Sequence, residues 1–368
     1  MIYKLRYTKK KITPYDSAES KTESSFSGIP EIRPEQRSCK QTLDDSPDWS
    51  DFCDFKKKFK YNDFVLAGDI GGTNTNLCIA GAGKKPDLLF SMHFKSSELE
   101  SLIPAVKEML KYAKEKHGIK VRNGCFAVAG PVSDGYARTT NIKWDVNAED
   151  ILRKTGLKRA ILINDFQAIG YGISFIGKKD LFVVRKGKSK GNKAIIGAGT
   201  GLGKSVLIFD GKAYKPVASE GGHADFPAQS KFELKLVEFI RKKRNIKQVN
   251  YEELVSGRGI EIIYKFLSNK KDNAEHIAKS SKETMNLFIK FYARCAKNFV
   301  LESLATGGLY IAGGIAAKNK KLFKSKEFLK EFENTSKLSA VLKKVPIYVI
   351  TNYDVGLIGA SFIAINMP

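Results

Sequence analysis

Two short segments combine glycines, hydroxyl groups and an acid in a spacing that suits phosphate chemistry. They read Gly-Asp-Ile-Gly-Gly-Thr-Asn and Gly-Thr-Gly-Leu-Gly, and each lies between two apolar runs. Glycines let backbone N–H groups approach a phosphate closely, and Asp69 is a hard oxygen ligand for Mg²⁺, directly or through water. We expect two hairpin turns, at 68–76 and 199–203, that hold one polyphosphate. The candidates are Gly68, Asp69, Ile70, Gly71, Gly72, Thr73, Asn74, Gly199, Thr200 and Gly201.

The second segment continues into Lys204-Ser205, an ending that it shares with the P-loop of many ATPases. The P-loop pattern requires a glycine where this chain has Ala198, and a helix after the serine. Residues 206–209 instead indicate a strand, which Asp-Gly then ends. We therefore reject a P-loop and place Lys204 on the exposed surface of the hairpin. Lys204→Ala is expected to be nearly silent, whereas Thr200→Val or Gly201→Val should impair nucleotide use.

A third glycine turn follows an apolar strand predicted at 309–312. Gly313 and Gly314 leave bare backbone against which a flat adenine and its ribose could lie, so both are candidates for ATP binding. The alternative is that these glycines only permit close packing between a helix and a strand.

Polar residues at two further turns form the second set of candidates. Asn164 and Asp165 end an apolar strand, and Glu220 and His223 lie three residues apart on a Gly-Gly turn. Asp165 could equally be the N-cap of a helix that begins near Phe166. His223 alone would more often be structural.

The elements that must position these residues alternate between strands and helices from residue 64 onward. Residues 98–117 show the apolar period of an amphipathic helix. Helices are expected through 231–304 and at the end of the chain, and a strand-rich stretch at 181–218. Single strands are expected at 65–67, 77–80, 124–129, 160–163, 309–312 and 347–350. This pattern predicts an α/β protein of two lobes.

With the three glycine turns in this order, the sequence resembles the sugar kinase/actin/Hsp70 superfamily, whose two RNase H-like lobes enclose ATP. The motifs Gly-Asp-Ile-Gly-Gly-Thr-Asn, Ile-Asn-Asp-Phe, Glu-Gly-Gly-His and Ile-Ala-Gly-Gly-Ile make it similar to bacterial-type glucokinases over about residues 64–366. The resemblance implies a two-lobed, actin-like ATPase fold with ATP and sugar in the cleft. We expect a small lobe at 63–175 plus 353–368, a large lobe at 176–352, and an irregular N-terminal extension at 1–62.

The resemblance also implies roles for individual residues. Asp165 would be the general base that takes a proton from the 6-hydroxyl of glucose, in the first step of glycolysis. Mg-ATP would donate the phosphoryl group, with Asp69 holding Mg²⁺ through water. The residues that would bind the sugar are Asn141, Asn164, Asp165, Glu220, His223 and Glu252. Glu253 is adjacent to Glu252, so the choice between them stays open, and Asn141 could instead cap a loop.

Composition limits the partners. The 368 residues carry a formal net charge of +24, and residues 1–62 hold 13 Lys and Arg against 10 Asp and Glu, so most of the excess lies in the remainder. The lysines there are dispersed and no nucleic-acid motif accompanies them, which favours a solvated basic surface that attracts anionic substrates. Five scattered cysteines without C-x-x-C pairs indicate reduced thiols rather than disulfides or zinc.

No stretch of about 20 apolar residues predicts a membrane span. A cytoplasmic protein is expected, although the first fourteen residues lack acids, as an organelle-targeting peptide can. The resemblance implies a homodimer.

Three alternatives remain. One is a kinase for another hexose or a hexosamine, although the large related group of such kinases carries a cysteine-rich zinc motif after the histidine that is missing here. The others are a catalytically idle scaffold that binds sugar and ATP and, less favoured, a basic nucleic-acid binder.

Overall fold

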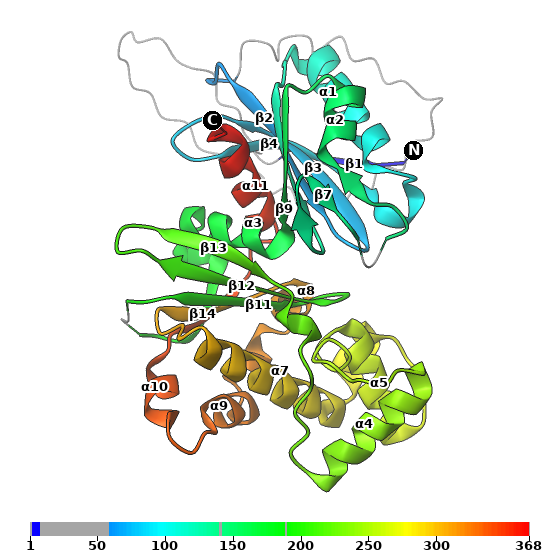
Figure 1. Ribbon diagram of the computed structural model, residues 1–368, viewed down its shortest axis with the longest axis vertical. Helices are drawn as coiled ribbons and strands as arrows, with labels where there is room; N and C mark the ends of the chain where they lie inside the picture. The colour runs from blue at the N-terminus through cyan, green and yellow to red at the C-terminus, as the bar shows by residue number, and fades with distance from the viewer. Residues whose placement is uncertain (1, 8–58, 140–141, 188–189, 368) are drawn as a thin grey trace, which may run out of the picture.

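The computed structural model describes residues 2–7, 59–139, 142–187 and 190–367. They form two six-stranded sheets stacked in two layers, with helices on the outer faces and two helices between the sheets (Figure 1). The first sheet has the order β1 (Lys4–Tyr7), β4 (Asp87–Lys95), β3 (Asn74–Gly81), β2 (Phe64–Ile70), β5 (Asn123–Val128) and β9 (Arg159–Asn164). The second has the order β10 (Leu181–Arg185), β15 (Ile347–Ile350), β14 (Gly308–Ala312), β11 (Lys193–Ala198), β12 (Leu202–Phe209) and β13 (Tyr214–Ser219).

Both sheets share one pairing pattern. Strands β2, β3 and β4 form an antiparallel meander, and β5 and β9 extend it in parallel from β2. In the second sheet β11, β12 and β13 form the meander, and β14 and β15 extend it in parallel from β11. Each meander begins with a glycine hairpin, so the two predicted phosphate turns occupy equivalent positions in the two lobes.

Helices cover the sheets on both faces. Helices α1 (Leu102–His117) and α2 (Ala148–Thr155) pack on the outer face of the first sheet, around Leu66, Phe90 and Met109. The large core below the second sheet includes residues of α4 (Lys231–Arg244), α5 (Gly257–Ser268), α7 (Lys282–Glu302) and α9 (Lys326–Glu333). Smaller elements are β6 (Val132–Ser133), β7 (Tyr136–Ala137), β8 (Val146–Asn147), α6 (Ala274–Ser280), α8 (Gly314–Lys318) and α10 (Ser339–Lys344).

Helices α3 (Asp165–Gly172) and α11 (Val355–Ile365) lie between the two sheets (Figure 1). Leu357 and Ala360 of α11 pack on the first sheet, whereas Phe166 of α3 packs on the second, beside Ile195 and Leu207. Small residues make this packing possible: a Cβ on Gly359 would lie 1.8 Å from the Ala168 carbonyl oxygen. The layer therefore fixes Asp165, the first residue of α3, at the junction of the two sheets.

The strands and helices expected from the sequence are present, with one difference at the N-terminus. Lys4–Tyr7 form β1 on the edge of the first sheet, although residues 1–62 were expected to be irregular. Four residues are too few to establish an alternating pattern in the sequence. The lobe boundaries near residues 175 and 352 stay a prediction. In the described part of the chain, no helix is both long and apolar enough to span a membrane.

Candidate active site

The first hairpin joins β2 to β3 through a tight turn. The Gly71 N–H donates to the Asn74 carbonyl at 2.9 Å, and Asp69 lies at the end of β2 opposite Asn76. Burial, and to a smaller extent the nearby negative charge of Asp354, together raise the pKa of Asp69 to about 6. The turn thus places backbone groups next to a partly buried carboxyl group whose pKa no neighbouring cation among the described residues lowers.

The second hairpin joins β11 to β12 and faces the first across the two lobes. The Thr73 and Thr200 hydroxyl oxygens are 3.0 Å apart. The Gly199 N–H donates to the Gly201 carbonyl at 2.8 Å, and a Cβ on Gly201 would lie 2.6 Å from Glu252 Oε2. The structure therefore brings the two glycine turns together, which the sequence could only suggest from their similar patterns.

The third glycine turn lies next to the second. Gly313 has φ +91°, and a Cβ there would lie 2.6 Å from the Ala198 carbonyl oxygen, so its close packing on β11 requires glycine. Gly314 has no atom within 4 Å of such a Cβ position. The packing interpretation thus accounts for Gly313, while Gly314 borders open space in which a planar group could lie.

Asp165 begins helix α3, and its neighbour Asn164 is the N-cap. Asn164 Oδ1 accepts hydrogen bonds from the Phe166 and Gln167 N–H groups at 2.9 and 3.2 Å, and Nδ2 donates to the Gly130 carbonyl at 3.2 Å. The amide oxygen of Asn164 is therefore used within the protein, and one amide hydrogen remains for a ligand. Because Asn164 is the N-cap of α3, the carboxylate of Asp165 is not needed in that role.

The electrostatic surroundings of Asp165 favour its neutral form. Burial raises its pKa to about 7, and the negative charges of Asp69 and Glu220 add to this effect. No Lys or Arg of the described residues forms an ion pair with Asp165. A carboxyl with a pKa near 7 can take up or release a proton at neutral pH, as a general base must.

Glu220 and His223 share the short 3-10 helix η6 (Gly221–His223) after β13. Glu220 Oε2 lies 3.8 Å from His223 Nε2, and Asn250 Nδ2 lies 3.4 Å from His223 Nδ1. The two side chains remain almost half exposed, 47% and 46%. They converge, as their spacing predicted, and both keep hydrogen-bonding capacity for a ligand.

The structure separates Glu252 from Glu253. Glu252 Oε2 accepts a hydrogen bond from the Leu202 N–H at 2.9 Å, at the second glycine turn, and Arg258 Nη2 lies 3.3 Å from Oε1. Glu253 instead forms an ion pair with Arg244 at 2.7 Å. Only Glu252 therefore lies beside the cleft elements.

A cavity of about 220 Å³ lies between the two lobes at these residues. Its lining joins Asn164 and Glu220 to six residues that the sequence had not singled out: Gly130, Pro131, Val132, Gln167, Ala218 and Ser219. Residues 130–132 directly follow β5, and parallel β5 and β9 end at the same sheet edge. The position of residues 130–132 just after a predicted strand was therefore the sequence signal that could have identified them as part of the cavity. Asn141 lies outside the described residues.

Lys204 was expected on the hairpin surface, and this is wrong. Only 2% of it is exposed, and its Nζ lies 5.1 and 5.0 Å from the ring centroids of Tyr251 and Phe299. Leu202 and Val206, two residues before and after it, face the same core below the sheet. Because side chains alternate along a strand, Lys204 shares that face, and Lys204→Ala would remove buried contacts.

Asp69 is the acid that the sequence proposed for Mg²⁺, and no dedicated cage of ligands surrounds it among the described residues. In the ranges that the structure describes, no three His, Cys, Asp or Glu residues gather as metal ligands. Mg²⁺ commonly uses one or two carboxylates, the phosphates of its substrate and several waters. A single carboxylate beside a phosphate turn fits that mode of binding.

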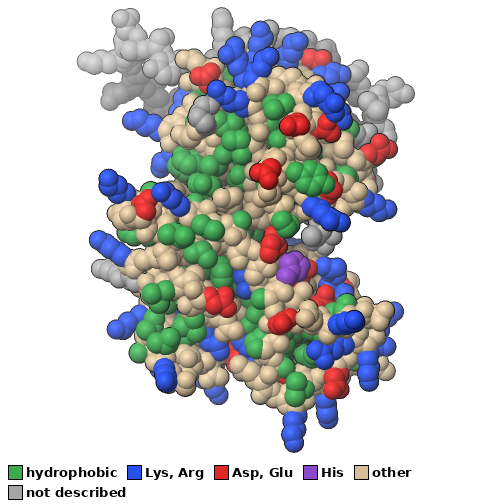
Figure 2. Space-filling model, in the orientation of Figure 1, with side chains coloured by type: hydrophobic (Ala, Val, Ile, Leu, Met, Phe, Trp, Pro, Cys, Tyr) green, Lys and Arg blue, Asp and Glu red, His purple; other side chains and the backbone are tan. Residues whose placement is uncertain are grey.

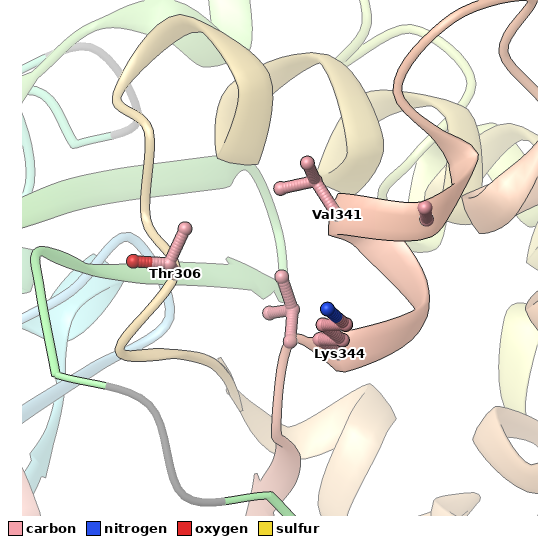
Figure 3. Close-up of a pocket in the computed structure, with 5 residues that line it drawn as sticks. Thr306, Val341 and Lys344 are labelled. Atoms are coloured by element: carbon pink, nitrogen blue, oxygen red, sulfur yellow. The ribbon is translucent and has the colours of Figure 1, made fainter.

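Among the described residues, one further cavity and the charges of the visible face can be compared with this site. On the visible face both acidic and basic side chains are spread over the two lobes, and Lys and Arg form no single stripe (Figure 2). A second cavity of about 180 Å³ is lined by Thr306, Ala340, Val341, Lys344 and Val345, where the labelled side chains surround a shallow hollow (Figure 3). None of these five side chains is an acid.

Comparisons with known proteins agree with this geometry. The family model described as Glucokinase matches residues 66–367. A glucokinase of Trichormus variabilis is 36% identical over 342 residues, which cover 82% of this chain and 99% of the relative.

Solved structures show the same fold. The glucokinase of an Antarctic psychrotroph has a TM-score of 0.69 at 26% identity, covering 83% of this chain and 99% of that one. The glucokinase of Balamuthia mandrillaris, solved in complex with glucose, has a TM-score of 0.74 at 23% identity, covering 82% and 93%. The two-lobed, actin-like ATPase fold that the motifs implied is thereby confirmed.

Proposed function

Because this chain belongs to the glucokinase family, we propose that Asp165 is the general base that takes the proton from the 6-hydroxyl of glucose. The overall reaction, ATP-dependent phosphorylation of glucose, follows from the family and from the relatives named glucokinase. The observation that carries the residue assignment is the position of Asp165, next to Asn164 of the cavity lining and close enough to Asp69 and Glu220 that their charges help to raise its pKa to about 7.

The chemistry needs one carboxylate at the nucleophile. When the hydroxyl oxygen attacks the γ-phosphorus of ATP, its O–P bond forms, the bond to ADP breaks, and Asp165 receives the hydroxyl proton. Asp165 performs this step in its ionised form: its Oδ1 accepts a hydrogen bond from the Phe166 N–H at 3.0 Å, and its Oδ2 is left to receive the proton. The product is glucose 6-phosphate, as in the first step of glycolysis.

The sugar hydroxyls require a fixed array of polar groups. Glu220, His223 and Glu252 offer carboxylate and imidazole groups from the large lobe, and Asn164 offers its remaining amide hydrogen from the small lobe. Each hydroxyl left without its partner costs about 1–3 kcal/mol, which is how such an array selects among stereoisomers. Gln167 and Ser219 line the same cavity and join the array.

The nucleotide lies across the two glycine hairpins. Backbone N–H groups at Gly72, Thr200 and Gly201 are suited to the phosphates, and Gly314 borders space suited to the adenosine. Mg²⁺ bound near Asp69 would neutralise charge on the phosphate oxygens. Asp69 would hold the ion through water, because the acid lies at the base of the hairpin rather than at its tip.

A coupled assay of ADP release tests the reaction on glucose, mannose, fructose, galactose and glucosamine. We expect turnover with glucose at the highest kcat/KM. A higher value on glucosamine or on another hexose would favour a kinase of different specificity. Folded protein that turns over none of these sugars would instead support the idle scaffold.

The nucleotide side has its own test. Gly201→Val should raise the KM for ATP at least tenfold, because its Cβ would clash with Glu252 and shift the turn. Gly211→Ala is a control for a strained glycine turn remote from the cleft elements: its Cβ would meet open space, but the positive φ of +96° should lower stability without changing the KM for ATP. Equal KM values for ATP in both variants would contradict the proposed role of the second hairpin.

A homodimer and a cytoplasmic location remain proposals drawn from the family resemblance. Sedimentation equilibrium over a range of protein concentrations would test the first. A mass of 40.9 kDa at all concentrations would contradict it.

A further inference from the structure

The N-terminal strand β1 lies outside the family-matched residues 66–367, yet it is built into the small lobe. Lys4, Leu5, Arg6 and Tyr7 pair with His93, Met92, Ser91 and Phe90 of β4. The odd residues face α1: the Tyr7 hydroxyl lies 2.7 Å from the Tyr112 hydroxyl, and the Tyr3 hydroxyl donates to Glu108 at 3.3 Å. The even residues, Lys4 and Arg6, therefore face the other side of the sheet.

That other side is the face on which α11 and Asp69 lie. The register across four strands aligns Lys4, His93, Asn76 and Asp69 in one row. His93 Nδ1 lies 2.8 Å from Asn76 Oδ1. A polar row therefore runs from the added strand to the acid of the first glycine hairpin.

Arg6 reaches the residue at which α11 begins. Its Nη2 lies 2.9 Å from Asp354 Oδ2 and its Nη1 lies 3.4 Å from Oδ1, in a bidentate arrangement. Asp354 is the N-cap residue of α11, and its N–H donates to Asn352 Oδ1 at 2.9 Å. Asn352 Nδ2 in turn lies 3.4 Å from Asp180 Oδ1, on the side of the second sheet. Arg6 thus holds the segment through which the chain returns from the second sheet to the first.

The first turn of α11 rests on Asp69. A Cβ on Gly356, two residues after Asp354, would lie 3.5 Å from Asp69 Oδ2. Any movement of Asp354 and of the helix start would therefore alter the packing around the carboxylate of Asp69.

We propose that Arg6 is a positioning residue for the nucleotide site: from the N-terminal strand it fixes Asp354 and the first turn of α11, and through them the side chain of Asp69. This inference rests on the proposed function of Asp69 beside the phosphates. The proposal gives β1, which lies outside the family-matched residues, a role in nucleotide binding.

The test compares Arg6→Met with Lys4→Met in the full chain. Both variants remove one cation from the same face of the same strand, but only Arg6 contacts Asp354. The side chains of Arg6 and Asp354 are 52% and 21% exposed, so loss of the pair should weaken nucleotide binding modestly. We expect Arg6→Met to raise the KM for Mg-ATP roughly two- to five-fold, in line with exposed ion pairs, without changing the KM for glucose. Lys4→Met should leave both values unchanged.

A second measurement separates positioning from general loss of stability. Arg6→Met and Asp354→Asn should be non-additive in the affinity for a non-hydrolysable ATP analogue, measured by calorimetry, because both break one link. Arg6→Lys should restore part of the affinity. Additive effects, equal effects of Arg6→Met and Lys4→Met, or a matching change in glucose KM would overturn the inference. An unmutated protein that binds the analogue but does not phosphorylate glucose would contradict the proposed function instead.

Discussion

Asp165, partly buried in the cleft, and Glu233, buried below the second sheet, have opposite electrostatic partners. Asp165 faces the acids Asp69 and Glu220, and its pKa rises to about 7. Glu233 accepts two hydrogen bonds from Arg294, at 2.7 and 3.0 Å, and one from Lys290 at 3.0 Å. Burial alone would raise the pKa of Glu233, but these donors bring it down to about 2.

The contrast separates an acid for chemistry from an acid for stability. Arg294 also donates to Glu331 at 2.7 Å and to the Pro227 carbonyl at 3.0 Å, so its network ties α4, α7 and α9 together. Every charge there has a partner, and none is left to exchange a proton at neutral pH. In the described part of the cleft, Asp165, Asp69 and Glu220 influence one another and none forms an ion pair with a Lys or Arg, an arrangement that costs stability and provides a base.

The largest effect is expected from Asp165→Ala. Loss of the general base should lower kcat by about 10²- to 10⁴-fold, while glucose binding, followed by intrinsic fluorescence, changes little. Asp150→Ala is the control, because this acid lies on the surface of α2 beside Arg153 and Lys154. A variant that keeps most of its kcat would show that Asp165 is not the base.

A substitution in the Arg294 network should have the opposite effect and lower stability far more than activity. Arg294→Met leaves Glu233 and Glu331 as buried carboxylates with fewer cations, so the free energy of unfolding in urea should fall by about 3–5 kcal/mol. The kcat of the folded fraction should fall far less than in Asp165→Ala. Lys95→Met, which breaks the exposed pair with Glu98, should cost under about 1 kcal/mol. If Arg294→Met and Lys95→Met lowered the free energy of unfolding by similar amounts, the buried network would have no special role in stability.

The two acids also predict different pH dependences. Because Asp165 must be ionised and its pKa is about 7, log kcat/KM should fall with unit slope as the pH drops below 7 and level off above it. The folded pKa of Glu233 lies below its ordinary value of 4.5, so its contribution to stability is present above pH 4.5 and is lost as the pH falls toward 2. Activity would therefore decline in a range where this contribution is intact. Coincident decline of activity and of thermal stability would argue against the assignment.

The smallest effect is expected at Lys204, a buried cation that lies on aromatic rings rather than beside an acid. Lys204→Met keeps most of the volume and should change the free energy of unfolding by less than about 1.5 kcal/mol. Lys204→Ala leaves a cavity and should cost about 2 kcal/mol or more. Urea denaturation of both variants measures the difference. If Lys204→Ala were as stable as the unmutated protein, the result would contradict the buried position of Lys204 and favour the surface position that the sequence suggested.

The sequence by itself determined the elements and the identity of the chemistry. Strand ends, glycine turns and the amphipathic helix follow from local patterns, because φ > 0, apolar alternation and helical period are properties of neighbouring residues. The order of the motifs was specific enough to indicate the family, and strands were expected at 65–67, 124–129 and 309–312, within a few residues of the observed β2, β5 and β14.

Only the tertiary structure decided which side chains meet. The 3.0 Å approach of Thr73 and Thr200, the choice of Glu252 over Glu253, and the burial of Lys204 all depend on residues more than 40 positions apart. The addition of β1 to the sheet depends on the position of β4, some 85 residues later. Such contacts arise when distant segments pack, so neither the composition nor the spacing of a single segment contains them.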